Sequence, residues 1–477
     1  MNLNHINVIA RYEVKLVKRS WLFRIFAILA LLFISAIMLG YQTGIVNRMD
    51  NLWPRIAVSS LMPFCNTYFY NIAQSVIVVF LAGSFLKRDK KLDTAEVIYV
   101  RPMSNADYIV GKTWGIVKVF ITLNIITLLF TAFLNILINK SPFDLFPYLF
   151  YLLTISVPSL LFVLGLSFTA MCILKNQAVT FIVMLGIIGT VFFYLTDTLY
   201  GVFDFFGVNI PAIFSDVTGH ADLRLFLLQR FSYLLAGIGL ISMTIALVKR
   251  LPHKPWKIAV VYTFSSLFLL AACLGGLLYI LHYNHQLDLR NQYITTFDKY
   301  ADAPHVDLLV NDLSVTPRGD RLAGKSTVKV VNNNTEVLDK IIFYLNPELT
   351  VTSVETGGKS LTFQRDHQVI VVDQPIQQQE ELTLTINYEG KISENICYTD
   401  VLKEDYLDTE VPQVFWRFGK RYAWLSNTFT LLTPECIWYP VAIAPVNPGA
   451  PYNIRKNFTN YTLTVHYEGD KTVLSQG

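Results

Sequence analysis

The sequence predicts a multi-pass α-helical membrane bundle followed by an all-β sandwich domain. The first observation is composition, because 53% of the residues are hydrophobic and only 16% are charged, whereas soluble proteins carry roughly 25% charged residues. The second is a series of long apolar windows in the first part of the chain. The third is a change to period-two alternation of apolar and polar residues after His285, which is typical of strands. The formal net charge of +4 gives no indication of nucleic-acid binding.

Residues 1–20 form a basic segment, with Arg11, Lys15, Lys18 and Arg19 among apolar residues. The segment could be an amphipathic helix on an anionic membrane face or an ordinary positively charged flank. Either reading places it in the cytoplasm. The first apolar run follows these charges and is too long for a cleavable signal peptide.

Seven windows have the length of about 20 mostly apolar residues that a spanning helix needs. They are residues 22–41, 65–86, 113–138, 146–174, 178–198, 226–248 and 258–281. The connections rich in Lys and Arg are 87–112 and 249–257, and 175–177 carries Lys175. Because basic connections stay in the cytoplasm, the N-terminus is predicted inside. Six spans then form one domain over 21–250, and a seventh within 251–284 delivers the rest of the chain outside.

Four amides fall at membrane depth, Asn71, Gln74, Asn124 and Asn135. Lipid offers them no hydrogen-bond partner, so they line a polar translocation path or bond between helices. Both readings stay open.

Two further features interrupt the apolar windows. Pro158 is expected to kink the fourth span. Between the fifth and sixth spans, an aromatic stretch interrupted by Asp204 and Pro211 predicts an interfacial or re-entrant segment on the outer side.

The C-terminal part predicts its own folded domain. Runs such as STVKVV, ELTLTINYEG and YTLTVHYEG alternate apolar and polar residues between turn signals. They predict an antiparallel sandwich over 306–477 on the outer side, joined to the seventh span by a linker over 285–305.

One segment in this domain, Gly319–Ser326 (GDRLAGKS), has the spacing of a phosphate-binding loop. That motif requires a strand before it and a helix after it. Here Lys325 and Ser326 lead into a strand pattern, so the segment is predicted to be a hairpin turn. The chain is therefore expected to bind no nucleotide or other cofactor, and to be no enzyme.

Metal and disulfide motifs are also weak. The eight histidines are scattered without HExxH or paired CxxC spacing, so no metal site is predicted. Five cysteines are too few for a disulfide scaffold. Cys397 and Cys436 could pair if their domain is extracytoplasmic.

The charged connector, residues 87–112, is the stretch with the clearest mechanical potential. Its first part has the spacing of a short amphipathic helix, and Arg101-Pro102 ends it. Ser104 or Asn105 then starts a helix that runs into the third span. The connector is a lever between a cytoplasmic partner and the bundle, or a solvated basic loop.

Residues 1–250 resemble the permease subunits of type-2 ABC exporters. The resemblance rests on YEVKLVKRSWLFRI, the span after it and the connector positions Thr94, Glu96, Arg101, Pro102, Ser104, Gly111 and Lys112. Asp93 departs from the family, in which many members have glycine. The resemblance implies a coupling helix on a separate ATPase subunit that uses the ATP, and a homodimer or heterodimer of permeases among the lipids of a bacterial cytoplasmic (inner) membrane.

Residues 305–477 resemble the N-terminal β domain of zinc aminopeptidases related to leukotriene hydrolase. The resemblance rests on VDLLVNDLSV, IIFYLNPELTVTSVETGGKSL, WYPV and the final YTLTVHYEG run. The catalytic HExxH helix of that family would lie beyond this sequence, so no catalytic residue is carried over.

The leading hypothesis is a permease subunit of an ABC-type exporter. The alternatives are a membrane-anchored peptidase-like protein, or a fragment of one, and a non-transporting envelope binding protein. An open frame continuing into HExxH would favour the peptidase, and absence of a neighbouring ATPase gene would favour the binding protein. The sequence leaves the transported substrate and its direction open.

Overall fold

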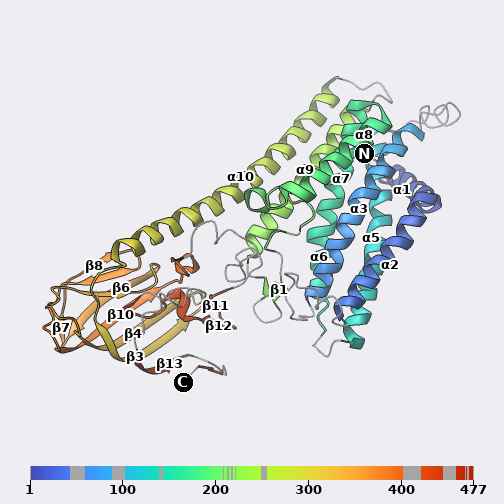
Figure 1. Cartoon of the computed structure of the whole chain (residues 1–477). Helices are drawn as coiled ribbons and strands as arrows, with labels where there is room; N and C mark the ends of the chain where they lie inside the picture. Colours follow the sequence, from blue (N-terminus) through green and yellow to red (C-terminus); the bar gives the residue numbers. More distant parts are fainter. Residues whose placement is uncertain are drawn as a thin grey trace. The chain divides into compact units, whose positions relative to one another are not determined.

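The structure is a computed structural model, and it describes residues 2–42, 60–88, 103–138, 143–207, 209–211, 214–215, 219–220, 222–248, 255–400, 421–443, 458–467, 469 and 472–475. It divides into two compact units, a helical one up to His282 and one dominated by strands from Tyr283 onward (Figure 1). Each unit has its own hydrophobic core. Thr94, Glu96, Arg101 and Pro102 of the connector lie outside the described residues.

The helical unit consists of long helices joined by short elements (Figure 1). In chain order these are α1 (Leu3–Arg19), α2 (Trp21–Gln42), α3 (Leu61–Arg88), α5 (Asn105–Ile138), α6 (Phe146–Tyr151), the π-helical η2 (Leu152–Ser156), α7 (Val157–Leu174), α8 (Gln177–Thr190), η3 (Val191–Leu195), η4 (Thr198–Gly201), β1 (Phe214–Ser215), β2 (Gly219–His220), α9 (Leu223–Leu247) and α10 (Pro255–Tyr300).

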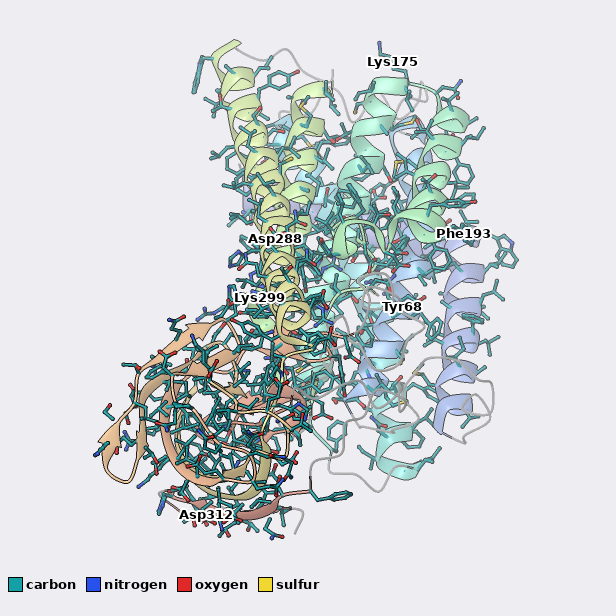
Figure 2. The ribbon with its side chains drawn as sticks, turned by 60° about the vertical axis from the view of Figure 1, so that its left-hand side comes forward. Tyr68, Lys175, Phe193, Asp288, Lys299 and Asp312 are labelled. Carbon is teal, nitrogen blue, oxygen red and sulfur yellow. The ribbon has the colours of Figure 1, made fainter. Side chains whose placement is uncertain are left out.

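Seven helical stretches among the described residues are long and apolar enough to cross a membrane, which confirms the predicted number. They cover Trp21–Gly40, Leu61–Ala82, Asn105–Ile138, Phe146–Leu174, Gln177–Leu195, Leu223–Leu247 and Trp256–Tyr300. Large apolar side chains on these stretches are exposed, such as Leu32 and Leu129 at 64% and 63%. Phe193, 72% exposed, points outward in Figure 2. An exterior of this kind is typical of a membrane protein.

The fourth window changes its hydrogen-bonding pattern next to Pro158. The π-helical turn η2 ends at Ser156, and Pro158 lies in the first turn of α7. Proline donates no backbone hydrogen bond and crowds the carbonyl four residues earlier. A π-helical turn before it is one way in which a helix accommodates that loss.

The connection between α7 and α8 is a tight turn at Lys175 (Figure 2). Lys175 is the C-cap residue of α7. Its φ of 55° is left-handed, and its backbone amide donates to the carbonyl of Met171. Asn176 then caps α8, because its side chain accepts hydrogen bonds from the amides of Ala178 and Val179. The sequence Lys-Asn thus reverses the chain within two residues.

The predicted linker over 285–305 is helical as far as Tyr300, because α10 continues without a break. The sequence has no glycine or proline between Gly276 and Pro304, so nothing stops the helix. Leu289, Tyr293 and Tyr300 also lie at helical spacing and pack in one apolar cluster with Val369 of the second unit. Burial of this face stabilises the helix beyond the apolar window.

The second unit contains a six-stranded sheet in the order β13-β3-β4-β10-β6-β7 and a three-stranded sheet in the order β5-β9-β8. The strands are β3 (Asp307–Arg318), β4 (Arg321–Val331), β5 (Ile341–Tyr344), β6 (Leu349–Thr356), β7 (Lys359–Ser360), β8 (Phe363–Asp366), β9 (Val369–Val372), β10 (Glu381–Gly390), β11 (Ala423–Leu425), β12 (Thr430–Leu432) and β13 (Asn460–Val465), with short 3-10 turns η5 (Glu394–Ile396) and η7 (Pro434–Cys436).

Both sheets contribute to one hydrophobic core. Their shared side chains include Val315, Val328 and Leu384 from the larger sheet and Phe343 and Val372 from the smaller. The six-stranded sheet is mixed rather than purely antiparallel as predicted, because β13 pairs parallel to β3, whereas the three-stranded sheet is antiparallel. Period-two patterning does not distinguish the two pairings, since both alternate side chains across the sheet.

Candidate functional site

The described end of the connector begins α5 with a reciprocal cap. The amide of Asp107 donates to Ser104 Oγ at 3.0 Å, and the amide of Ser104 donates to Asp107 Oδ2 at 3.2 Å. This is the arrangement of a capping box, with aspartate in place of the usual glutamate. The helix start predicted at Ser104 or Asn105 is therefore confirmed.

The same end is fastened to two other helices. Asp107 Oδ1 accepts a hydrogen bond of 2.8 Å from the amide of Asn2, which caps α1. The side-chain amide of Asn105 donates at 2.8 Å to the carbonyl of Val248, the residue that ends α9. Both Asn105 and Asp107 are buried, at 0% and 4% exposed. The first turn of α5 thus joins the start of α1 to the end of α9.

Helix α1 packs against α5 through two glycines. A Cβ at Gly111 would lie 2.8 Å from Ile9 Cβ, and one at Gly115 would lie 2.7 Å from Glu13 Cβ and 2.9 Å from the Ala10 carbonyl oxygen. Such distances leave no room for a side chain. Small residues four apart let two helices approach closely. Gly111 is one of the positions that carry the family resemblance, but the sequence alone does not predict its contact with α1.

Lys112 of the connector is also buried, at 4% exposed. Its Nζ lies 4.7 Å from the centre of the Tyr108 ring, a cation–π arrangement. Burial of both a lysine and the acidic Glu13 (1% exposed) at this joint shows that the connector's end is packed protein rather than a solvated loop.

Three of the four amides predicted at membrane depth lie together. Asn71 accepts from Gln74 at 2.5 Å and donates to Ser159 Oγ at 3.3 Å, and Asn124 donates to Ser156 Oγ at 2.6 Å. Asn135 is separate and donates to the Tyr148 hydroxyl at 2.6 Å. All four are at most 2% exposed. The Gln74–Asn71 bond lies within α3, and the other bonds join different helices, as the bonding reading of these residues expects.

The aromatic segment between α8 and α9 is buried among the helices, which agrees with a re-entrant character. Asp204, Phe206 and Ile210 are at most 1% exposed. The Asp204 carboxylate accepts the amides of Phe206, Gly207 and Asn209 at 2.7–3.0 Å. Asp204 is therefore the residue that folds this loop, where the sequence reading treated it only as an interruption.

Side chains from several helices bind the carbonyl groups of this loop. Asn71 donates to Phe206 at 2.9 Å, Ser159 to Phe205 at 2.5 Å, Gln229 to Gly201 and Asp204 at 3.0 Å, Tyr233 to Val202 at 2.8 Å and Tyr279 to Tyr200 at 2.9 Å. Irregular backbone inside a helix bundle needs such donors, because no water replaces them.

Arg230 of α9 also holds this loop and was missed by sequence reasoning. It is 1% exposed and donates to the carbonyls of Asp204 and Phe205 at 3.3–3.4 Å. The available signal was a single arginine inside the apolar window 226–248. A charged residue at that depth is rare and marks a specific partner.

The second unit gives no sign of a nucleotide or metal site within the described residues. Lys325 and Ser326 lie inside β4, and Arg318 pairs with Arg321 across the turn, which confirms the predicted hairpin. Among the residues that the structure describes, no group of three or more His, Cys, Asp and Glu side chains could hold a metal ion.

No protein-family model matches the chain, and no curated protein matches it. Among solved structures, a mutant M1 zinc metallopeptidase from Deinococcus radiodurans bound to a Tyr-Ser-Ala substrate is 19% identical, with 34% of this chain and 33% of the enzyme covered and a TM-score of 0.25. Native leukotriene A4 hydrolase from Saccharomyces cerevisiae is 16% identical, with 18% and 15% covered and a TM-score of 0.16.

These neighbours are of the class that the sequence of the β domain resembles. The chain spans about a third of the length of the metallopeptidase. At such TM-scores the matches carry no argument about the activity of this chain, and they do not bear on the permease resemblance.

Proposed function

We propose that this chain is a membrane permease subunit of an ATP-driven exporter, moved by a separate ATPase that docks on the connector 87–112. The observation that carries the proposal is the joint at the connector's end, where the first turn of α5 is bonded to Asn2 and Val248. Seven helices long and apolar enough to span a membrane support the transport role.

The joint provides a path for force. The described end of the connector opens α5, a continuous helix of 34 residues, so a displacement of that end is carried along the helix. The same displacement acts on α1 through the glycine contact and on α9 through Asn105. Rigid-body movement of packed helices is an established way of coupling a partner's state to a distant site.

The first test is recovery of the partner from native membranes. We expect the wild-type chain to copurify with a nucleotide-binding subunit, and Glu96→Lys combined with Arg101→Glu to reduce its recovery at least ~10-fold, since 1.4 kcal/mol of lost binding already has that effect. Lys359→Glu, an exposed change on β7, is the control and should leave recovery unchanged. Absence of any nucleotide-binding partner from the wild-type sample would refute the proposal.

The second test breaks the joint without touching the connector's charges. Gly115→Leu places a side chain where only 2.7 Å separates a Cβ from Glu13, so α1 must move away, at a cost of about 1–3 kcal/mol. We expect weaker recovery of the ATPase. Gly186→Leu is the matched control, because nothing lies within 4 Å of its Cβ position. Equal recovery with both variants would show that docking of α1 plays no part.

A further inference from the structure

Two cysteines of the second unit, far apart in the sequence, lie side by side in its interior. The sulfur atoms of Cys397 and Cys436 are 3.3 Å apart, and the residues are 2% and 0% exposed. Cys397 follows the short turn η5 and Cys436 ends the short turn η7. A disulfide needs sulfurs about 2.05 Å apart, so a closure of roughly 1.3 Å, within reach of side-chain rotation, would join them.

The backbone on both sides of this cysteine pair is fixed by buried side chains. Arg290 donates to the carbonyl of Cys397 at 2.6 Å and to that of Tyr398 at 2.6 Å. Asn346 donates to the carbonyl of Cys436 at 2.7 Å. Neither anchor belongs to the segments that carry the cysteines. The two positions are therefore held in register by the fold itself, before any covalent bond forms.

A second pair of bonds ties the neighbouring segments together. Glu394, three residues before Cys397, accepts hydrogen bonds from the amides of Tyr422 and Ala423 at 2.5 and 3.0 Å. Asn346 also donates to the carbonyl of Ser393 at 2.9 Å. Asn346 thus bonds to the segment before Cys397 as well as to Cys436, and Glu394 bonds the segment before Cys397 to residues 422–423.

The surroundings are those of a structural thiol pair rather than of a catalytic one. The contact with the Cys397 sulfur, burial and the nearby carboxylates of Glu394 and Glu435 all raise the pKa of the Cys436 thiol. Catalytic dithiols need the opposite, a lowered pKa and access to solvent. A bond between such buried sulfurs, once formed, is protected from reductants.

We propose that Cys397 and Cys436 are a built disulfide site, oxidised by a donor that carries a disulfide of its own. A thiolate of the pair attacks the donor disulfide, and a mixed disulfide forms with release of one donor thiol. The other cysteine then displaces the second donor thiol. The pair loses two electrons and two protons, and the donor disulfide becomes two thiols. The bond closes the segment 397–436 into a covalent loop.

The test counts free thiols in the purified full-length chain, which has five cysteines. The chain is incubated with oxidised glutathione in a low urea concentration that permits local opening. It is then denatured and labelled with a maleimide–polyethylene glycol reagent, which shifts the gel band once for each thiol. We expect three labels without reductant and five after reduction, with mass spectrometry finding one cross-linked peptide that holds both cysteines. Five labels in both samples would overturn the proposal.

Matched variants separate this pair from the other cysteines. Cys397→Ser has no second cysteine to complete the exchange and should give no cross-linked peptide, whereas Cys273→Ser, an exposed position in α10, should still give that peptide. If all four cysteines of the oxidised Cys273→Ser variant are labelled, a different pair forms the disulfide and the proposal fails.

A sample denatured in N-ethylmaleimide directly from living cells, then reduced and labelled, counts the cysteines that were oxidised in the cell and so adds the compartment. Two labels there uphold the site and show that a disulfide donor reaches it. No label from cells, with three labels after oxidation of the purified chain, upholds the site and contradicts the extracytoplasmic location instead. Neither result depends on the proposed ATPase partner.

Discussion

Two buried arginines, one in each unit, hold irregular segments by their backbone carbonyls. Arg230 of the helical unit donates to Asp204 and Phe205 at 3.3–3.4 Å. Arg290 of the second unit donates to Asn395, Cys397 and Tyr398 at 2.6–3.1 Å. Both are at most 2% exposed. In each case a guanidinium with several donors replaces the water that would otherwise satisfy a loop.

The two sites differ in what surrounds the guanidinium. Near Arg230 the loop also contains the fully buried Asp204, and further donors come from Gln229 of the same helix and from three other helices, through Asn71, Ser159 and Tyr279. Arg290 has shorter bonds and fewer companions. The loop inside the apolar bundle therefore holds a buried charge of each sign together with many neutral donors, whereas Arg290 meets only backbone carbonyls in the β unit.

Replacing Arg230 should have the largest effect on stability. Arg230→Met leaves the carbonyls of Asp204 and Phe205 with fewer donors and leaves the buried Asp204 without its positive neighbour. Removing one member of a buried charged group costs about 3–5 kcal/mol. We expect a clear fall in the unfolding temperature of the detergent-solubilised chain, followed by tryptophan fluorescence, and a lower yield in membranes.

The control for this variant is Arg224→Met, an exposed position in the same helix. It makes the same chemical change without touching the loop and should leave the unfolding temperature nearly unchanged. Equal losses from both variants would mean that Arg230 does not support the loop as described.

Replacing Arg290 should have a smaller but distinct effect, confined to the second unit. Arg290→Met removes three hydrogen bonds to carbonyls around Cys397, which is expected to cost about 2–3 kcal/mol. That corresponds to a shift of roughly 5–10 °C in the unfolding temperature of a domain of this size. Arg321→Met on the exposed face of β4 is the control. A shift no larger than that of the control would contradict the anchoring role.

Much of the helical unit could be predicted from sequence because membrane helices follow from local composition. The seven apolar windows, the cap at Ser104 and the buried character of the loop around Asp204 are all signals within one stretch of chain. The partners of Arg230 were beyond reach, because the carbonyls that it binds lie about 25 residues away in an irregular segment. No periodic pattern reports such a contact.

The second unit shows the same limit. Alternation predicted its strands and the hairpin at Gly319, but it did not predict the parallel pairing of β13. The change of composition after His285 predicts a linker over 285–305, whereas α10 continues to Tyr300, because Tyr293 gives this stretch a buried face. The sequence likewise does not predict the packing of α1 against Gly111 and Gly115, because it depends on the matching shapes of two helices far apart in the sequence.

An exposed ion pair in the second unit should have the smallest effect of the three. Lys299 Nζ lies 2.6 Å from Asp366 Oδ2, with the side chains 61% and 30% exposed. The hydrogen bond from Lys299 lowers the pKa of Asp366. Because the folded pKa lies below the unfolded one, the stabilisation is present above the unfolded value, about 3.9, and is lost as pH falls through the folded value.

Solvent screening keeps this contribution small. Asp366→Asn should lower the unfolding temperature by under about 2 °C at neutral pH, and the difference should shrink in acid, as pH falls below about 3.9, and in 1 M salt. Unfolding scans of both chains at these three conditions test it. A loss as large as that from Arg290→Met, or one that persists in acid, would mean that Asp366 acts through packing. The contrast between buried and exposed cations would then fail.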